Sequence, residues 1–200
     1  MEHLYNKCQF TAAILAGGKN SRFGGKTKAK MMIDGRTLIE KTIRVLETVF
    51  DDIIIITNSK GELPEFKNIR MFADIYHNKG PLGGLHSALT NSQKEAVFML
   101  ASDMPDISAG IIRRQLAQFT GKQADALLPR HDSFIEPLHA VYRKSILPGL
   151  EKYLAESQLL AIREFLKQVS VDYFRISNIE KQNVFININT QEDLNNYLNT

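Results

Sequence analysis

The chain has 200 residues, 44% of them hydrophobic and 24% charged, and its 25 Lys and Arg against 22 Asp and Glu give a formal net charge of +3. This length fits one α/β domain spanning residues 1–200, and so small a positive excess gives no reason to expect a nucleic-acid partner. The single cysteine, Cys8, excludes an internal disulfide and favours the cytoplasm, and no apolar run approaches the roughly 18 residues of a membrane span, so no membrane partner is expected.

Short apolar or β-branched runs alternate with helical patterns along the chain. Buried strands are predicted at residues 11–16, 52–57, 68–73, 96–101, 124–129 and 183–188. Helices are predicted between them, at residues 38–50, 85–91, 111–119, 162–169 and 194–198, with N-caps at Thr37, Ser108 and Thr190. This alternation predicts an α/β fold of three layers, α/β/α and Rossmann-like, with a mostly parallel sheet covered on both faces.

A basic, glycine-rich loop follows the first predicted strand, in "LAGGKNSRFGGKTKAK" (15–30). Its "GKT" suggests a Walker phosphate loop, but Asn20 stands where the first glycine of that motif belongs. The Rossmann fingerprint fails as well, because Lys19 replaces its second spaced glycine. Glycines at a strand end still permit close backbone approach, and the cations can neutralise phosphates. The sequence therefore predicts that this loop binds an anionic ligand. The alternative is a solvated basic loop without a ligand. Its cations are Lys19, Arg22, Lys26, Lys28 and Lys30.

"LAGGKNSRFGG", followed by Lys28 seven residues before the glycine of "DG", resembles the entry motif of nucleotidyltransferases related to the sugar-phosphate nucleotidylyltransferases. The "LAGG" form is most similar to the molybdenum cofactor guanylyltransferase family. The resemblance runs over about residues 11–199. It implies the nucleotidyltransferase fold, with a nucleotide-binding part at about 11–107 and an acceptor-binding part at about 108–200. It also implies that Lys28 contacts the nucleotide phosphates and that the strand end binds the nucleotide through Leu15, Ala16, Gly17 and Gly18.

A second motif, "GPLGG" (80–84), precedes the helix expected to begin near Leu85. Glycines before a helix N-terminus suit an anionic ligand, although a plain turn is the more common explanation of a Gly-Pro pair in a loop. The stretch matches the family, and the resemblance places Gly83 at the acceptor site. It also places Asn58 and Asp74, which follow two predicted strands, at the nucleotide site.

A third motif, "AVFMLASDMPDI" (96–107), carries an apolar strand into Asp103. Ligands of open α/β sheets bind at the carboxyl ends of the strands, and Mg²⁺ needs only one or two protein carboxylates beside phosphate oxygens. Asp103 is therefore the metal-ligand candidate, with a turn-capping role as the alternative. The resemblance implies that Asp103 binds both Mg²⁺ and the nucleotide.

Two later stretches, "IEPLHAVY" (135–142) and "NINTQEDL" (187–194), also resemble the family. The resemblance places Asn187 and Asn189 at the acceptor site, while helix capping is an equal alternative for both. His139 alternates with apolar neighbours and is read as a packed strand residue.

Taken together, the resemblance implies transfer of GMP from GTP to the phosphate of molybdenum-loaded molybdopterin, without a covalent intermediate. Mg²⁺ would be the cofactor, and Arg22, Lys28 and Asp103 would be the catalytic residues. Other molybdenum cofactor biosynthesis proteins and apo-molybdoenzymes are further expected partners. Three alternatives stay open: a cytidylyltransferase acting on the same pterin, another sugar-phosphate-type nucleotidylyltransferase, and a non-catalytic nucleotide-binding protein.

Overall fold

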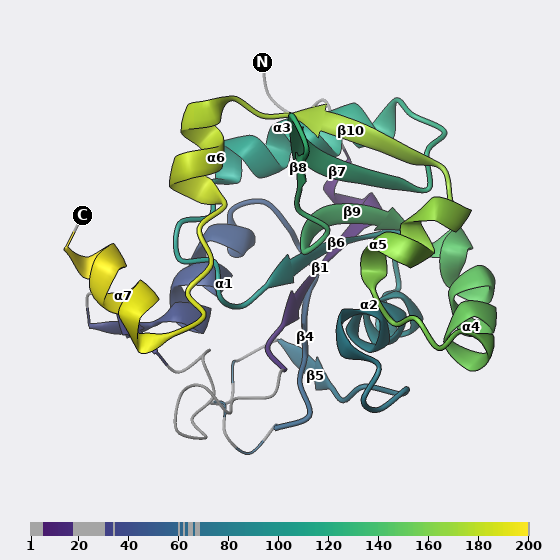
Figure 1. Ribbon diagram of the computed structural model, residues 1–200, viewed down its shortest axis with the longest axis horizontal. Coiled ribbons are helices and arrows are strands. Elements are labelled where there is room, and N and C mark those ends of the chain that lie inside the picture. The colour runs from purple at the N-terminus through teal and green to yellow at the C-terminus, as the bar shows by residue number, and fades with distance from the viewer. Residues whose placement is uncertain are drawn as a thin grey trace.

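A computed structural model describes residues 6–17, 31–33, 35–59, 61, 63, 66 and 69–199 (Figure 1). Its main sheet contains β1 (Phe10–Leu15), β4 (Ile53–Ile56), β5 (Arg70–Phe72), β6 (Ala96–Ala101), β7 (Ala126–His131), β8 (Phe134–Ile135), β9 (His139–Arg143) and β10 (Val171–Arg175). The strand order is β10-β7-β9-β6-β1-β4-β5, and β8 pairs with β7. Strand β9 is antiparallel to both of its neighbours and β8 to β7, whereas the other pairs are parallel. The predicted mostly parallel sheet is confirmed.

Helices cover both faces of this sheet (Figure 1). They are α1 (Leu38–Glu47), α2 (Gly80–Asn91), α3 (Ala109–Thr120), α4 (Leu147–Glu156), α5 (Ile162–Phe165), α6 (Asn178–Val184) and α7 (Gln191–Leu198), with short 3-10 turns at Lys7–Gln9, Lys144–Ile146 and Leu166–Gln168. Helices α1, α3 and α6 pack into one core, and α2, α4 and α5 into the other. Ala12 and Ala13 of β1 point into opposite cores, as the two-residue period of a strand requires. None of the helices in the described residues is long and apolar enough to cross a membrane.

The predicted helix starts agree with the structure wherever a side-chain cap marks them. Thr37 and Glu40 form a capping box at α1, with the Thr37 N–H donating to Glu40 Oε2 over 2.8 Å. Ser108 caps α3, and Thr190 forms a second capping box with Asp193 at α7. Helix α2 has no side-chain cap and begins at Gly80 rather than near Leu85, so the expected start was wrong.

The strand predicted at residues 183–188 is also wrong. Val184 is the last residue of α6, and residues 185–188 belong to no strand. The apolar side chains of this stretch are buried, because Val184 and Phe185 pack into the core shared with α3 and Ile188 packs beneath α7. Burial alone produced the apolar pattern, which does not distinguish a strand from a helix end followed by an irregular segment. Strands β9 and β10 complete the sheet instead.

His139 is a packed strand residue, as expected. It begins β9 and is completely buried, with the rings of Phe98 and Phe185 at 5.0 and 4.9 Å from its own. Both ring nitrogens are buried without a hydrogen-bond partner, and burial lowers the pKa of His139 to about 4. A neutral, unpaired imidazole of this kind is a core residue and not a general base.

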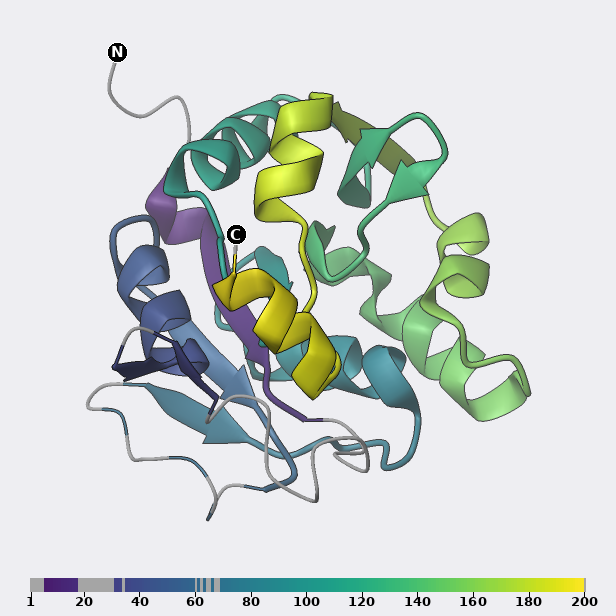
Figure 2. The same ribbon diagram turned by 60° about the vertical axis from the view of Figure 1, so that its left-hand side comes forward.

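A small third cluster joins the C-terminal helix to a hairpin. Strands β2 (Met32–Ile33) and β3 (Arg36–Thr37) pair antiparallel, and Gly35 between them has φ +76°, a backbone conformation that favours glycine. The hairpin–α7 cluster consists of the buried residues Ile33, Leu38, Ile188 and Leu194. Figure 2 shows α7, in yellow, beside this hairpin. The Tyr197 hydroxyl of α7 donates to Asp106 Oδ1 over 2.8 Å, which ties the helix to the segment after β6.

Candidate active site

The carboxyl end of β1 lies in the middle of the sheet edge, between the ends of β4 and β6. The Ala16 N–H donates to the Ile56 carbonyl over 2.9 Å, and the Ser102 N–H donates to the Leu15 carbonyl over 3.1 Å. Gly17 continues this edge beside Asn58. A Cβ added to Gly17 would lie 3.8 Å from the backbone nitrogen of Asn58, which is an ordinary contact distance. Leu15, Ala16 and Gly17, which the sequence assigned to the nucleotide, therefore stand where open α/β sheets bind ligands.

Asn58 and Asp74 lie together at the adjacent strand ends. Asn58 Nδ2 donates to Asp74 Oδ2 over 2.8 Å, and the Asp74 N–H donates to Asn58 Oδ1 over 2.9 Å. The two bonds fix both side chains next to the end of β1. The structure thus brings together two residues that the sequence assigned to the nucleotide site, and their contact with a nucleotide stays a prediction.

Asp103 lies in the turn directly after β6, on the same edge. Its backbone carbonyl accepts the Ile188 N–H over 2.9 Å, which brings the segment between α6 and α7 against this turn. Half-buried Asp103 therefore stands where the nucleotide-binding part meets the part assigned to the acceptor.

Glu136 is the carboxylate that the sequence reading missed. It follows β8, is only 9% exposed, and accepts the Leu138 N–H on Oε1 over 2.9 Å. Burial raises the pKa of Glu136, and the negative charge of Asp103 adds to the rise. The hydrogen bond from Leu138, the nearby Asn187 side chain and the charge of Arg163 lower this pKa. In the sequence, Glu136 stands out as a lone carboxylate between apolar residues in "FIEPLHAV". Its neighbours in space, such as Asp103, are far from it in the chain, so no sequence pattern pointed to them.

Asn187 and Asn189 flank Ile188 at the same junction. The Asn187 side chain lies near Glu136, and its Oδ1 is buried without a hydrogen-bond partner. The Asn189 N–H donates to Asp193 Oδ2 over 2.8 Å. Thr190 is the N-cap of α7 and forms the capping box with Asp193, so neither asparagine is the N-cap, and the acceptor contacts predicted for Asn187 and Asn189 stay a prediction.

Gly83 lies inside α2 rather than in a loop before it. An added Cβ would come within 2.7 Å of the Tyr76 carbonyl oxygen, and one on Gly84 within 3.0 Å of Leu15 Cδ2. Internal packing thus accounts for both glycines, because the helix approaches its neighbours too closely for a side chain. The acceptor contact predicted for Gly83 stays a prediction.

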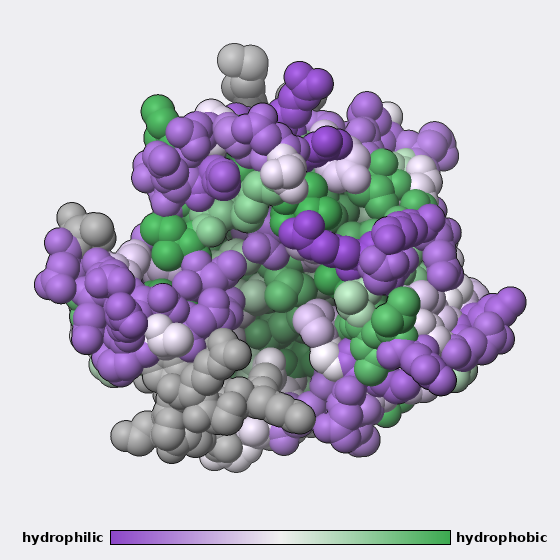
Figure 3. Space-filling view, viewed as in Figure 1, coloured by the Kyte–Doolittle hydropathy of each residue, from purple (hydrophilic) through white to green (hydrophobic). Residues whose placement is uncertain are grey.

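The remaining predicted site residues, Gly18, Arg22 and Lys28, lie outside the described residues, as do the other cations of the basic loop. The space-filling view shows the surface hollowed near the centre of this face, between α6 and α7 on the left and α5 on the right, with apolar side chains on its floor (Figure 3).

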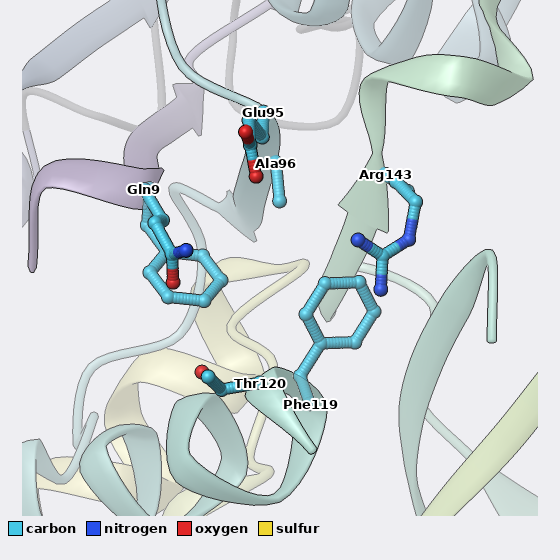
Figure 4. Close-up of a pocket in the computed structure, with 7 residues that line it drawn as sticks. Gln9, Glu95, Ala96, Phe119, Thr120 and Arg143 are labelled. Carbon is cyan, nitrogen blue, oxygen red and sulfur yellow. The ribbon is translucent and has the colours of Figure 1, made fainter. Parts of the chain in front are cut away.

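A small pocket of about 50 Å³ lies at the opposite, amino edge of the sheet (Figure 4). Glu95 and Arg143 are its charged lining residues, and Arg143 donates to the carbonyls of Ala124 and Lys122 and lies 4.7 Å from the Phe119 ring centroid. These internal contacts explain Arg143 as a structural residue, so the carboxyl edge remains the candidate active site.

Comparison with known proteins identifies the family of the chain. Residues 12–172 match the model of the MobA-like NTP transferase domain. The chain belongs to this family. Relatives of this MobA-like chain include a probable molybdenum cofactor guanylyltransferase of Peptoclostridium acidaminophilum, 37% identical over 94% of this chain and 87% of the relative. Another, of Clostridium perfringens, is 34% identical over 92% and 93%. The solved structure of molybdopterin-guanine dinucleotide biosynthesis protein A from Archaeoglobus fulgidus superposes with a TM-score of 0.78 at 25% identity, covering 93% and 95% of the two chains.

Proposed function

We propose that this MobA-like protein transfers GMP from GTP to the phosphate of molybdenum-loaded molybdopterin, forming the guanine dinucleotide cofactor and pyrophosphate. The observation that carries the proposal is that relatives covering more than nine-tenths of this chain are named molybdenum cofactor guanylyltransferases. The site geometry supports it, because the strand-end, amide and carboxylate groups expected for a nucleotide share one sheet edge. We place the reaction in the cytoplasm, with the cofactor passing to other molybdenum cofactor proteins and apo-molybdoenzymes.

The reaction would rely on positioning and charge neutralisation. The backbone from Leu15 to Gly17 would bind the guanine edge, Asn58 and Asp74 would bind the nucleoside, and Arg22 and Lys28 would neutralise the triphosphate. An oxygen of the acceptor phosphate attacks the α-phosphorus in line, a new P–O–P bond forms, and the bond to the β-phosphate breaks with its electron pair leaving on pyrophosphate. No general base is required, since the attacking phosphate is already ionised.

We infer that a magnesium ion binds beside the turn after β6. Asp103 and buried Glu136 are close enough for one carboxylate to raise the pKa of the other, so the pair would be stabilised by a cation. Carboxylate oxygens are the ligands that Mg²⁺ prefers, and one or two suffice beside phosphate oxygens. We propose that Asp103 holds the ion. When bound, Mg²⁺ would stabilise negative charge on the reacting phosphates.

The test is incubation of the protein with molybdenum-loaded molybdopterin, Mg²⁺ and each of the four nucleoside triphosphates, with detection of pyrophosphate and of the dinucleotide product. GTP is expected to be used well ahead of CTP and ATP, because a site that hydrogen-bonds one base edge can reject another by ~10⁴-fold. Comparable turnover with CTP would make the protein a cytidylyltransferase. Binding of GTP without pyrophosphate release would make it a non-catalytic nucleotide-binding protein.

A further inference from the structure

Two side chains hold the backbone on either side of Asp74. The Asp74 N–H donates to Asn58 Oδ1 over 2.9 Å, and the next N–H, that of Ile75, donates to Ser87 Oγ over 2.8 Å. Because each peptide unit is planar, the two bonds fix the peptide planes that flank the Asp74 Cα atom. Both rotatable backbone angles of Asp74 are thereby restrained, although the segment after β5 that carries it belongs to no helix or strand.

Ser87 reaches this segment from the interior of the molecule. It lies on α2 and is completely buried. The helix packs closely against the same segment, because a Cβ added to Gly83 would come within 2.7 Å of the Tyr76 carbonyl oxygen, and the ring centroids of Tyr76 and His86 are 4.7 Å apart. A buried hydroxyl is destabilising unless it is hydrogen-bonded, and alanine is the better helix former. The bond to Ile75 is therefore what serine provides here and alanine would not.

The two oxygens of the Asp74 carboxylate have different surroundings. Oδ2 accepts Asn58 Nδ2 over 2.8 Å, whereas Oδ1 has no protein donor among the residues that the structure describes. An ionised carboxylate only accepts hydrogen bonds, so Oδ1 suits a hydroxyl or N–H group of a nucleoside and repels an ionised phosphate. The direction in which Oδ1 points depends on the backbone angles of Asp74, and hence on the bond to Ser87.

We propose that Ser87 is a positioning residue of the nucleotide site, whose buried hydroxyl accepts the Ile75 N–H and so orients the Asp74 carboxylate toward the nucleoside. This inference rests on the proposed function. Ser87 itself does not touch the nucleotide, since none of its surface is exposed. It gives α2 a part in nucleotide binding, because the helix supports the segment after β5 from the inside.

The test is Ser87→Ala, which removes the hydroxyl with little change in size. The KM for GTP should rise about three- to tenfold, the effect of losing one hydrogen bond's restraint, while kcat and the KM for molybdenum-loaded molybdopterin stay nearly unchanged. Ser92→Ala is the matched control. Ser92 directly follows α2, is 2% exposed, and is hydrogen-bonded to the Thr11 hydroxyl over 2.8 Å at the amino edge of the sheet. Its replacement should lower the thermal midpoint without changing either KM.

A double-variant cycle tests whether Ser87 acts through Asp74. With Asp74→Ala already present, Ser87→Ala should raise the KM for GTP no further, because the carboxylate that Ser87 orients is gone. Full additivity of the two losses would overturn the proposal. So would an unchanged KM for GTP in Ser87→Ala, or an equal rise in Ser92→Ala, which would make the general stability of α2 the cause.

Binding of GTP without the acceptor distinguishes this inference from the proposed function. Titration calorimetry with GTP and Mg²⁺ needs no turnover. If the wild-type protein binds GTP about three- to tenfold more tightly than Ser87→Ala yet no nucleotide supports transfer, the proposed function fails and the positioning role stands. If transfer occurs but the two proteins bind GTP equally, the positioning role is refuted and the proposed function stands. If the wild-type protein does not bind GTP, both are refuted.

Discussion

The backbone N–H of Ile188 donates to the backbone carbonyl of Asp103 over 2.9 Å. This bond attaches the segment that carries Asn187 and Asn189 to the turn that carries the metal-ligand candidate. Because backbone atoms make it, side-chain substitution of Asp103 leaves the bond in place. The chemistry of the Asp103 carboxylate can therefore be tested separately from the architecture of the site.

Asp103→Asn should abolish magnesium-dependent transfer while leaving the thermal midpoint nearly unchanged. The amide keeps the shape of the side chain but removes the negative charge expected to hold the ion. Initial rates at saturating Mg²⁺ and thermal unfolding are the two measurements. Asp106→Asn, three residues on and bonded to Tyr197, is the matched control and should keep its rate. A near-normal rate in Asp103→Asn would make this residue a turn cap.

The kcat/KM for GTP should depend on Lys28 more than on the neighbouring lysines of the basic loop. A charge-assisted hydrogen bond to phosphate contributes about 1.5–3 kcal/mol, so Lys28→Ala should lower kcat/KM for GTP by about ten- to a hundredfold. Lys26→Ala and Lys30→Ala should lower it much less under the same magnesium concentration. A large loss at Lys26 with little at Lys28 would restore the Walker interpretation of the loop.

Gly83→Ala should destabilise the protein although alanine is the better helix former. The new methyl group would lie 2.7 Å from the Tyr76 carbonyl oxygen, and overpacking of this kind costs about 1–3 kcal/mol. Gly149→Ala in α4 is the control, since nothing lies within 4 Å of its added Cβ and helix propensity should stabilise the variant by about 0.5–1 kcal/mol. Urea unfolding measures both. Equal stabilisation of the two variants would contradict the prediction and show that α2 moves enough to accommodate the added methyl group.

Stability should fall in mild acid because of His139. Burial lowers its pKa from 6.5 to about 4, so between these values the unfolded chain binds a proton that the folded protein excludes. The free energy of unfolding therefore decreases as the pH falls through this window, by at most about 3 kcal/mol. His139→Phe keeps an aromatic ring and removes the titration. Urea unfolding at about pH 7 and about pH 5 should show a smaller decrease in the variant, and identical decreases would exclude His139 as the cause.

Short sequence patterns were sufficient to predict the helix starts that neighbouring residues determine. Thr37 with Glu40, and Thr190 with Asp193, specify helix starts within four residues, and the structure has both capping boxes. Strand ends placed Asn58, Asp74 and Asp103 correctly on one edge, because parallel strands align their carboxyl ends.

What the sequence did not reveal depends on contacts between distant segments. Glu136 comes near Asp103 and Asn187 because the strand that follows it, β9, inserts antiparallel between β6 and β7, and no spacing in the chain encodes that insertion. Similarly, Phe185 and Ile188 are apolar because they fill two different cores, and such a stretch has the same composition as a strand. The start of α2 was missed because close packing against Tyr76 and Leu15, rather than a capping side chain, positions its first turn.

The hairpin–α7 cluster is much smaller than the cores on the two sheet faces, with four buried residues in the part of the chain that is described. So small an apolar contact makes local opening easier than unfolding of the whole sheet. On heating, α7 should detach from the hairpin first and carry the segment of Asn187 away from Asp103. The segment predicted to bind the acceptor would then be displaced while the sheet is still folded, so we expect heat inactivation to precede melting and to be reversed on cooling.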